Sequence, residues 1–344
     1  MRAILLPGDR TVEFANLPDP VPGEGEVLVE MHYSAICGTD LHRYRQPRAE
    51  LASTTHMVTG HEPVGVVAAL GPGVRWPNVG DRVVMHLLVG CNRPECAACR
   101  NRQPKLCRNR RVMMRDVHGS NADYQVLPAI NCLPLPDIFA WEEGAILACN
   151  FGTAWAATRK VPVSGQTVVA IFGLGPVGLC VVLSARAMGA PVIGVDVVAE
   201  RLEMASKLGA FAVIDATVEN PVARIRDLTE GLGCDAAIDT SGASVAQTNA
   251  LDSLRREGKM MVVGVGTSKE WTIRPREQLM VKEATIQGTH VFEATDWETM
   301  LRFVRRHRLN LSAIVDRVYD PEQAVEAFRR ADEGRSGKIV FRWQ

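Results

Sequence analysis

Between residues 165 and 290, short apolar runs alternate with segments that have a helical pattern of apolar residues. The runs lack polar alternation, which is typical of strands that are buried on both faces of a parallel sheet. Because helical segments separate them, they predict a doubly wound α/β domain with a six-stranded parallel sheet over residues 151–290. The predicted strands are 168–172, 192–195, 212–214, 236–238, 260–263 and 285–288.

A glycine-rich turn follows the first of these strands and opens the next helix. Its first glycine permits a tight turn, its second lets the backbone approach a pyrophosphate, and its third lets helix and strand pack closely. The helix N-terminus offers N–H donors and the positive end of its dipole to phosphates. This context favours a Rossmann dinucleotide site over a turn that only packs. The turn consists of Gly173, Leu174, Gly175, Pro176, Val177 and Gly178.

Asp196 ends the second predicted strand, at the distance from the glycines that this motif requires. Its carboxylate is suited to accept hydrogen bonds from the adenosine ribose hydroxyls, and it would repel a 2′-phosphate. We therefore expect NAD(H) rather than NADP(H) as the cofactor, with Arg201 beside the same ribose.

The first 150 residues have a different pattern, in which short apolar strands are separated by glycine and proline. Frequent short strands with turn signals favour a compact β-barrel or sandwich. The last segment, 291–344, contains two amphipathic helices and a final strand, 338–342, and is too small to be a domain. We expect it to complete the first domain. The predicted N-terminal strands are 3–6, 27–31, 64–70, 82–85 and 124–127.

The charge balance argues against several classes of partner. There are 39 Lys and Arg residues against 39 Asp and Glu residues in a chain of 344, so the formal net charge is zero. A neutral chain gives no electrostatic reason to expect nucleic acid or an anionic membrane as partner. No apolar run approaches the length of about 20 residues that a membrane span needs, and the N-terminus lacks a signal-peptide pattern. We expect a soluble, cytoplasmic protein.

Four of the nine cysteines lie close together, spaced C-x4-C-x2-C-x7-C within a lobe at 90–108. Four thiolates from one short segment suit a tetrahedral Zn²⁺ in a closed structural site. Unrelated reduced thiols and disulfides within the loop are the alternatives. The expected ligands are Cys91, Cys96, Cys99 and Cys107.

Three further elements are weak signals by themselves: Cys37, the pair His61-Glu62, and Cys149. A lone histidine is most often an ordinary residue, and a lone buried cysteine behaves as a small hydrophobe. Their combination with a nucleotide-binding fold is informative. In this context the sequence resembles the zinc-dependent medium-chain dehydrogenase/reductase superfamily, of the alcohol, polyol and threonine dehydrogenase kind. The resemblance covers essentially the whole chain and rests on 36–42, 60–62, 80–83, the cysteine lobe, the glycine turn with Asp196, and 337–340.

The resemblance implies a GroES-like β-barrel catalytic domain and two zinc ions. Cys37, His61 and Cys149 match the ligands of a catalytic zinc that polarises the alcohol oxygen. Glu62 matches a residue behind the metal that in relatives replaces water or becomes a ligand, and Asp40 matches a carboxylate that orients the ligand histidine. Thr39 and His42 resemble a relay for the alcohol proton. We also expect five further residues to line the cofactor site: Thr240, Val263, Gly264, Val265 and His290.

The substrate signals conflict. Polyol-type members place glutamate where Cys149 stands, and cysteine there is more typical of simple alcohol dehydrogenases. Threonine-type members carry a histidine where this chain has Leu88, yet the 36–42 segment and the length are closer to the threonine and polyol group. Leu87 and Leu88 imply some apolar lining of the pocket. The lobe also departs from the family, because four residues instead of two separate Cys91 from Cys96.

These signals favour an oxidoreductase that transfers hydride between NAD and a secondary alcohol, polyol or amino alcohol. The alternative is a zinc-stabilised NAD-binding sensor or scaffold without dehydrogenase activity. A zinc-finger nucleic-acid binder is disfavoured by the neutral charge. Relatives are dimers or tetramers, and strand 285–288 could pair across a two-fold axis, so we expect a homodimer or homotetramer.

Overall fold

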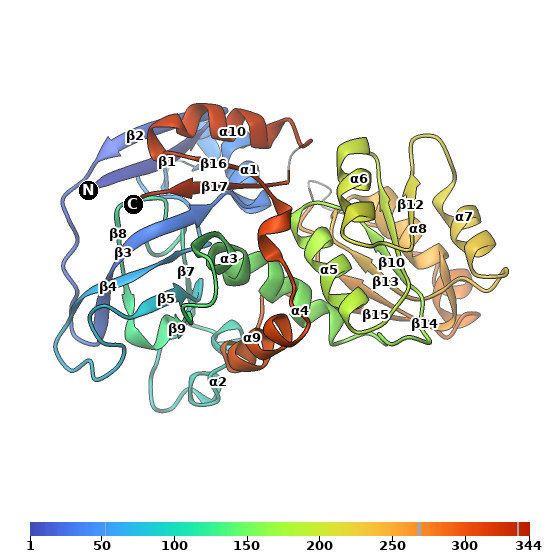
Figure 1. Cartoon of the computed structure of the whole chain (residues 1–344), viewed down its shortest axis with the longest axis horizontal. Helices are drawn as coiled ribbons and strands as arrows, with labels where there is room; N and C mark the ends of the chain where they lie inside the picture. The colour runs from blue at the N-terminus through green and yellow to red at the C-terminus, as the bar shows by residue number, and fades with distance from the viewer. Residues whose placement is uncertain (52, 267–269, 336) are drawn as a thin grey trace. The chain divides into compact units, whose positions relative to one another are not determined.

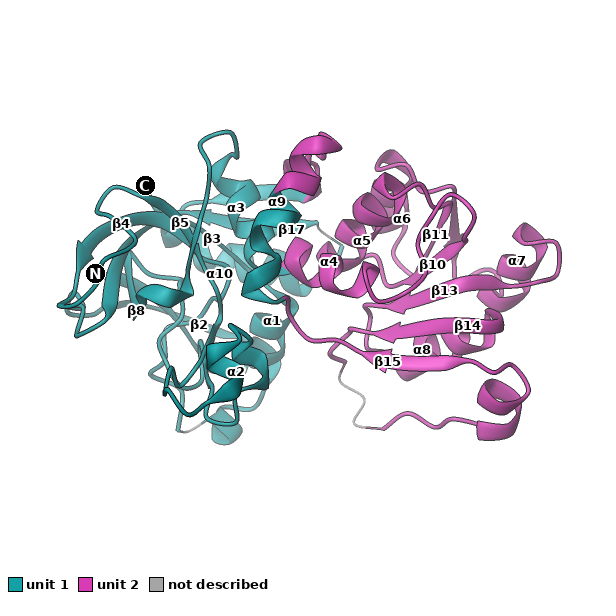
Figure 2. Cartoon of the chain, turned by 90° about the horizontal axis from the view of Figure 1, so that it is seen from below, with its two compact units in different colours: residues 1–149, 293–301, 315–344 teal, residues 150–292, 302–314 magenta. Residues whose placement is uncertain are grey.

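The computed structural model describes residues 1–51, 53–266, 270–335 and 337–344, which form two compact units (Figure 2). Unit 1 comprises Met1–Cys149, Glu293–Leu301 and Val315–Gln344, and unit 2 comprises Asn150–Phe292 and Arg302–Ile314. No helix of the described residues is long and apolar enough to span a membrane.

Unit 2 contains a parallel sheet of six strands in the order β12-β11-β10-β13-β14-β15 (Figure 1). The sheet extends from β10 in both directions, so the order of the strands reverses between β10 and β13. Open α/β sheets bind ligands at such a point, beyond the carboxyl ends of the strands. The predicted doubly wound sheet is confirmed. Its strands are β10 (Val169–Phe172), β11 (Val192–Asp196), β12 (Ala212–Asp215), β13 (Cys234–Asp239), β14 (Leu254–Val262) and β15 (Thr285–Gly288).

Helices connect successive strands of this sheet, and their apolar faces pack against it. In α6, Leu202 and Ala205 are buried, and the helix ends before Gly209, whose φ of +91° suits a residue without a side chain. All four residues of β10 are buried, as a strand covered on both faces requires. The connecting helices are α5 (Pro176–Ala187), α6 (Ala199–Lys207), α7 (Pro221–Leu228) and α8 (Ser244–Asp252), and α4 (Gly152–Thr158) precedes β10.

Unit 1 is mainly β structure. A seven-stranded sheet has the order β16-β17-β3-β4-β5-β9, with β8 also paired to β3, and β1 (Arg2–Gly8) pairs with β2 (Thr11–Asn16). Much of β3 alternates buried and partly buried residues, which is the pattern of a strand with one face on a core. The sheet strands are β3 (Glu26–Ala35), β4 (Val64–Leu70), β5 (Arg82–Met85), β8 (Tyr124–Pro128), β9 (Cys132–Pro134), β16 (Val315–Tyr319) and β17 (Lys338–Arg342).

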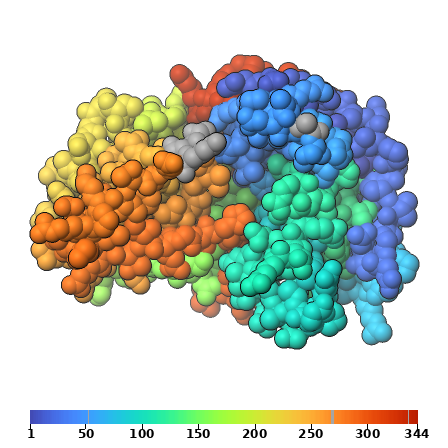
Figure 3. Space-filling model, turned by 180° about the vertical axis from the view of Figure 1, so that it is seen from behind, coloured from blue at the N-terminus to red at the C-terminus, as the bar shows by residue number. Residues whose placement is uncertain are grey.

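Short helices and a small hairpin complete unit 1. The cysteine lobe contains α2 (Ala97–Arg100) and begins and ends beside the pair β6 (Leu88–Val89) and β7 (Arg111–Val112). In the space-filling view, the residues near position 100, coloured teal, bulge from the surface of unit 1 (Figure 3). The helices of the main body are α1 (Gly38–Arg45), α3 (Trp141–Ile146) and α10 (Ala324–Asp332).

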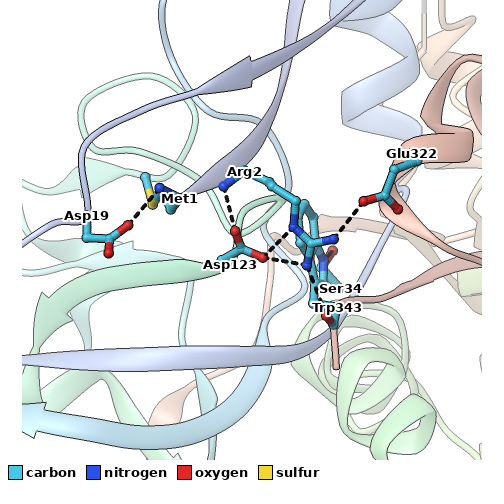
Figure 4. A network of polar contacts seen from close by, with 7 residues as sticks. All are labelled: Met1, Arg2, Asp19, Ser34, Asp123, Glu322 and Trp343. Atoms are coloured by element: carbon cyan, nitrogen blue, oxygen red, sulfur yellow. Dashed lines mark hydrogen bonds and ion pairs between the residues drawn. The ribbon is translucent and has the colours of Figure 1, made fainter.

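The C-terminal segment is tied to the N-terminal strands by backbone pairing and by a polar network (Figure 4). β17 pairs antiparallel with β3, and Trp343 Nε1 donates a hydrogen bond to Ser34 Oγ over 2.9 Å. Arg2 forms ion pairs of 2.7 Å with both Asp123 and Glu322. These contacts explain why residues 315–344 belong to unit 1, as expected.

The segment 302–314 departs from our expectation that all of 291–344 would lie with the first domain, because it groups with unit 2. It contains the end of α9 (Trp297–Arg306). Phe303 packs on Trp155 of α4, with ring centroids 4.8 Å apart, and the turn Leu311–Ile314 contacts α5. The apolar face of this segment therefore finds its partners in unit 2.

Substitution of Gly178 tests the close packing at the start of α5. A Cβ there would lie 2.0 Å from the carbonyl oxygen of Gly173, so Gly178→Ala should lower the free energy of unfolding of the protein by about 1–3 kcal/mol. Gly288→Ala in β15 is the matched control, because a Cβ there meets nothing within 4 Å and should be neutral or slightly stabilising. Chemical denaturation measures both, and equal stabilities would contradict the packing argument.

Candidate functional site

Four side chains from distant parts of the sequence converge in unit 1: Cys37, His61, Glu62 and Cys149. One ligand atom of each lies within 4.8 Å of the others. Cys37 is the residue before α1, and the pair His61-Glu62 lies just before β4. Cys149 lies in a π-helical turn, Leu147–Phe151, which is a local form often found at functional sites. The residues that were weak signals separately thus form one group.

Asp40 holds two of these segments together. Its fully buried carboxylate accepts hydrogen bonds from the backbone N–H of Cys37, at 2.8 Å, and of Gly60, at 3.1 Å. Asp40 was expected to orient the ligand histidine, and one of these hydrogen bonds goes to Gly60, the residue before His61. It therefore positions the ligand histidine through the backbone of the preceding residue.

The ring of His61 has a different neighbour, which the sequence analysis missed. Its Nδ1 lies 3.2 Å from the Sδ of Met114, a buried residue with a φ of +70°. Because Nδ1 makes this contact, Nε2 is the ring nitrogen that remains for another partner. Methionine carries no sequence signal for such a backbone conformation, so only the structure reveals the contact.

The ionisation of this group follows from its burial and from its mutual contacts. The Cys149 thiol donates to the Cys37 sulfur and lowers the pKa of Cys37 well below its ordinary value, while the pKa of Cys149 is raised. Burial disfavours the charged form of His61, yet the neighbouring Cys37 thiolate raises the pKa of the imidazole to about 9. Without a metal ion, protons thus offset the negative charge of the group.

Glu62 has a charged partner from the other end of the chain. Lys338 Nζ lies 2.5 Å from Glu62 Oε2, and both side chains have no exposed surface. Burial raises the pKa of Glu62, and the neighbouring ammonium group of Lys338 lowers it. Lys338 lies in the 337–340 motif, and the sequence pattern alone predicts no role for it.

The donor set of this group fits a zinc ion. Two cysteine sulfurs, an imidazole and a carboxylate are all zinc ligands, and a set of three with an open position is typical of catalytic sites. Zinc binds cysteine as thiolate and histidine as neutral imidazole, so binding of a divalent ion would release the protons that these side chains carry.

Thr39 and His42 lie on α1, directly after Cys37. Thr39 is in the first turn and exposed, and His42, three residues further along, is half-buried. Residues with this spacing lie on the same face of a helix.

The four cysteines of the lobe form a second group, again with their sulfur atoms within 4.8 Å of one another. The sulfurs of Cys91 and Cys99 are 3.8 Å apart, those of Cys96 and Cys107 are 3.9 Å apart, and all four thiols are free. The longer first spacing therefore does not keep Cys91 out of the group. Lys105 forms a 2.7 Å ion pair with Glu293. This donor set fits a closed, four-thiolate zinc site.

In unit 2, the glycine-rich turn joins β10 to α5 with a different constraint at each glycine. Gly173 has a φ of +93°, and a Cβ at Gly178 would lie 2.0 Å from the Gly173 carbonyl oxygen. Gly175 immediately precedes α5, and a Cβ there would meet nothing within 4 Å. The turn thus leaves open space at the helix N-terminus, which fits a phosphate group.

Asp196 lies at the end of β11, next to this turn. Its carboxylate accepts hydrogen bonds from the backbone N–H groups of Leu174, Val197 and Val198. Arg201 lies 3.8 Å from the same carboxylate, and its buried Nε has no hydrogen-bond partner among the described residues. An unbonded buried donor beside Asp196 fits a polar ligand such as a ribose.

The remaining expected cofactor residues lie at the same edge of the sheet, after the carboxyl ends of β13, β14 and β15. Thr240 Oγ1 donates to the Gly173 carbonyl oxygen over 2.6 Å. The backbone N–H groups of Val263 and Gly264 donate to the Asp239 carbonyl, whereas Val265 and His290 are exposed.

Comparisons with known proteins agree with this geometry. The family model for the alcohol dehydrogenase GroES-like domain matches residues 23–137, and the model for zinc-binding dehydrogenases matches residues 176–306. The L-threonine 3-dehydrogenase of Pyrococcus horikoshii is 35% identical over 96% of this chain and 94% of its own length.

Two solved structures match this chain over its full length and over the full length of their own chains. The alcohol dehydrogenase TADH from Thermus sp. ATN1 is 28% identical with a TM-score of 0.91, and an NAD-dependent alcohol dehydrogenase is 27% identical with a TM-score of 0.86. The GroES-like fold expected for the first domain is confirmed. The chain is therefore an oxidoreductase that belongs to the zinc-binding dehydrogenase family with an alcohol dehydrogenase GroES-like domain.

Proposed function

We propose that this protein is an NAD-dependent zinc alcohol dehydrogenase that acts on uncharged secondary alcohols or polyols. The observation that carries the proposal is the convergence of Cys37, His61 and Cys149, with Glu62, within 4.8 Å in unit 1. A sensor or scaffold has no need for such a ligand set beside a separate structural cysteine site. The oligomeric state and the cytoplasmic location expected from the sequence stay predictions.

Cys37, His61 and Cys149 would hold the catalytic zinc, and the lobe cysteines would hold the structural one. When bound, the catalytic ion supplies a Lewis acid that makes an alcohol hydroxyl more acidic. Thr39 Oγ1 is assigned to accept the alcohol proton, and His42 to pass it on. Thr39 is exposed and His42 is half-buried on α1, so a proton passed between them can reach solvent.

The open space at Gly175 and the surroundings of Asp196 support NAD as the hydride acceptor. The N-terminus of α5 would bind the pyrophosphate. The Asp196 carboxylate would bind ribose hydroxyls and repel a 2′-phosphate. The buried Nε of Arg201, beside this carboxylate, would donate a hydrogen bond to the same ribose.

An uncharged substrate is favoured because the charged side chains next to the candidate metal centre are already engaged within the protein. Glu62 and Lys338 pair with each other, and Asp40 is bonded to backbone N–H groups. The side chain beside the ligand histidine is the thioether of Met114. An amino acid such as threonine needs partners for an ammonium and a carboxylate group, and these residues are engaged within the protein.

A screen of NAD⁺ reduction tests the proposed function. Secondary alcohols, diols and sugar alcohols should be oxidised, with kcat/KM at least about tenfold higher than for L-threonine, because unpaired charges would be buried in that complex. NAD⁺ should give a higher kcat/KM than NADP⁺. A preference for threonine or for NADP⁺ would contradict the substrate or cofactor assignment. Absence of turnover across the panel would favour the sensor alternative.

Removal of a proposed ligand tests the catalytic metal site. Zinc analysis of the wild type should give about two ions per chain, and Cys37→Ala should give about one. Activity should be almost lost, while NADH binding, measured by fluorescence, should be retained. Cys132→Ala is the matched control, because Cys132 is a buried thiol in β9 outside both cysteine groups. Near-normal kcat in Cys37→Ala would refute the ligand assignment.

The proposed relay predicts a pH-dependent defect. His42→Ala should slow alcohol oxidation mainly at low pH, where hydroxide is too scarce to accept the proton in place of the side chain. His56→Ala, at an exposed histidine of the same unit, should leave the pH profile of kcat unchanged. If both variants keep the wild-type profile, His42 has no part in proton transfer.

A further inference from the structure

Lys338 is a charged residue in a place where charge is costly. It is the first residue of β17, its side chain has no exposed surface, and it contacts the candidate metal centre from a strand near the end of the chain. Fully buried lysines are rare unless they are paired, because an ammonium group loses several kcal/mol of hydration. Such a residue is expected to have a specific partner.

The ammonium group of Lys338 contacts two segments that carry proposed zinc ligands. It forms the 2.5 Å ion pair with Glu62, which follows His61, and it donates a 2.7 Å hydrogen bond to the carbonyl of Ile36, which precedes Cys37. The strand that carries it is firmly placed. β17 pairs with β3, and the N–H of Ile36 donates to the carbonyl of Ile339 over 3.0 Å.

Glu62 is close enough to the other three residues to complete a set of four protein ligands. A carboxylate oxygen of Glu62 lies within 4.8 Å of the ligand atoms of Cys37, His61 and Cys149. Four protein ligands make a closed zinc site, whereas a catalytic site keeps one position for water or substrate. Whether Glu62 turns to the metal or to Lys338 therefore decides whether the site is open.

We propose that Lys338 is a positioning residue that holds Glu62 off the metal and so keeps the fourth coordination position open. This inference rests on the proposed function. Two thiolates and a neutral imidazole already balance a divalent ion, so a glutamate ligand would add a negative charge and would leave the buried ammonium unpaired. The pairing of Glu62 with Lys338 avoids both costs.

Cobalt substitution provides a readout that does not depend on turnover. The visible absorption of Co²⁺ depends on its ligands, and free imidazole is a small probe that binds only to an open position. The lobe site, with four thiolates, should not respond and so gives a constant background. In the wild-type holoprotein, imidazole should shift the cobalt bands, and Cys149→Ser should abolish that shift.

In Lys338→Met, the released carboxylate should ligate the metal. The cobalt bands should then differ from wild type without imidazole, and imidazole affinity should fall about tenfold or more. The double variant Lys338→Met/Glu62→Gln should recover the wild-type imidazole response, and Lys338→Arg should retain it. A wild-type imidazole affinity in a folded Lys338→Met would overturn the proposal while leaving the proposed function intact.

If Lys338→Met does not fold, the single variant Glu62→Gln provides a second test. The amide oxygen of the glutamine can still accept a hydrogen bond from Lys338. The cobalt bands and imidazole affinity of this variant should match the wild type. A clear change in the bands would show that Glu62 is already a ligand beside Lys338, and this would overturn the proposal. If the wild type itself shows no imidazole-responsive cobalt, the proposed function fails instead.

Discussion

The candidate metal centre depends on a buried carboxylate that is not one of its proposed ligands. Asp40 accepts hydrogen bonds from the backbones of Cys37 and Gly60, and so joins the start of α1 to the segment that carries His61. Separation of the two segments would leave a fully buried carboxylate without partners, at a cost of several kcal/mol. Two of the three proposed zinc ligands are therefore fixed relative to each other before any metal is bound.

The same centre is organised around a balance of charge. The contact with Cys149 lowers the pKa of Cys37, the Cys37 thiolate raises the pKa of His61, and Lys338 forms an ion pair with Glu62. Every charge in this buried group has a partner, which is the condition for stability in a medium of low polarity. A divalent ion can replace the protons on the sulfurs and the imidazole without disturbing the pair of Glu62 and Lys338. The group is thus suited both to bind zinc and to remain folded without it.

Much of the architecture could be predicted because it depends on local patterns. The strands of unit 2 are buried on both faces and read as continuous apolar runs, and Gly178 is required by its contact with Gly173. The grouping of Cys37, His61, Glu62 and Cys149 was expected from family resemblance, since nothing in the local sequence connects them. The grouping of the lobe cysteines followed from their spacing alone.

What could not be predicted depends on long-range contacts and on backbone conformations that have no residue signature. The ion pair of Lys338 joins two segments more than half the chain apart, and the contact of Met114 with His61 needs a positive φ at a methionine. Asp40 was expected to orient the ligand histidine, and its hydrogen bonds to the backbone of Cys37 and Gly60 carry no sequence signal. Residues 302–314 continue an amphipathic helix into the other unit because their apolar partners are there.

The late position of β17 has a consequence for biogenesis. During synthesis, unit 2 can complete its sheet as soon as Gly288 has left the ribosome, whereas the β3 edge of unit 1 must wait for residues 338–342. The ion pair between Lys338 and Glu62 therefore forms only after this last strand has been synthesised. The contact on which the proposed role of Lys338 depends thus links the first strands of unit 1 to a strand that is made much later.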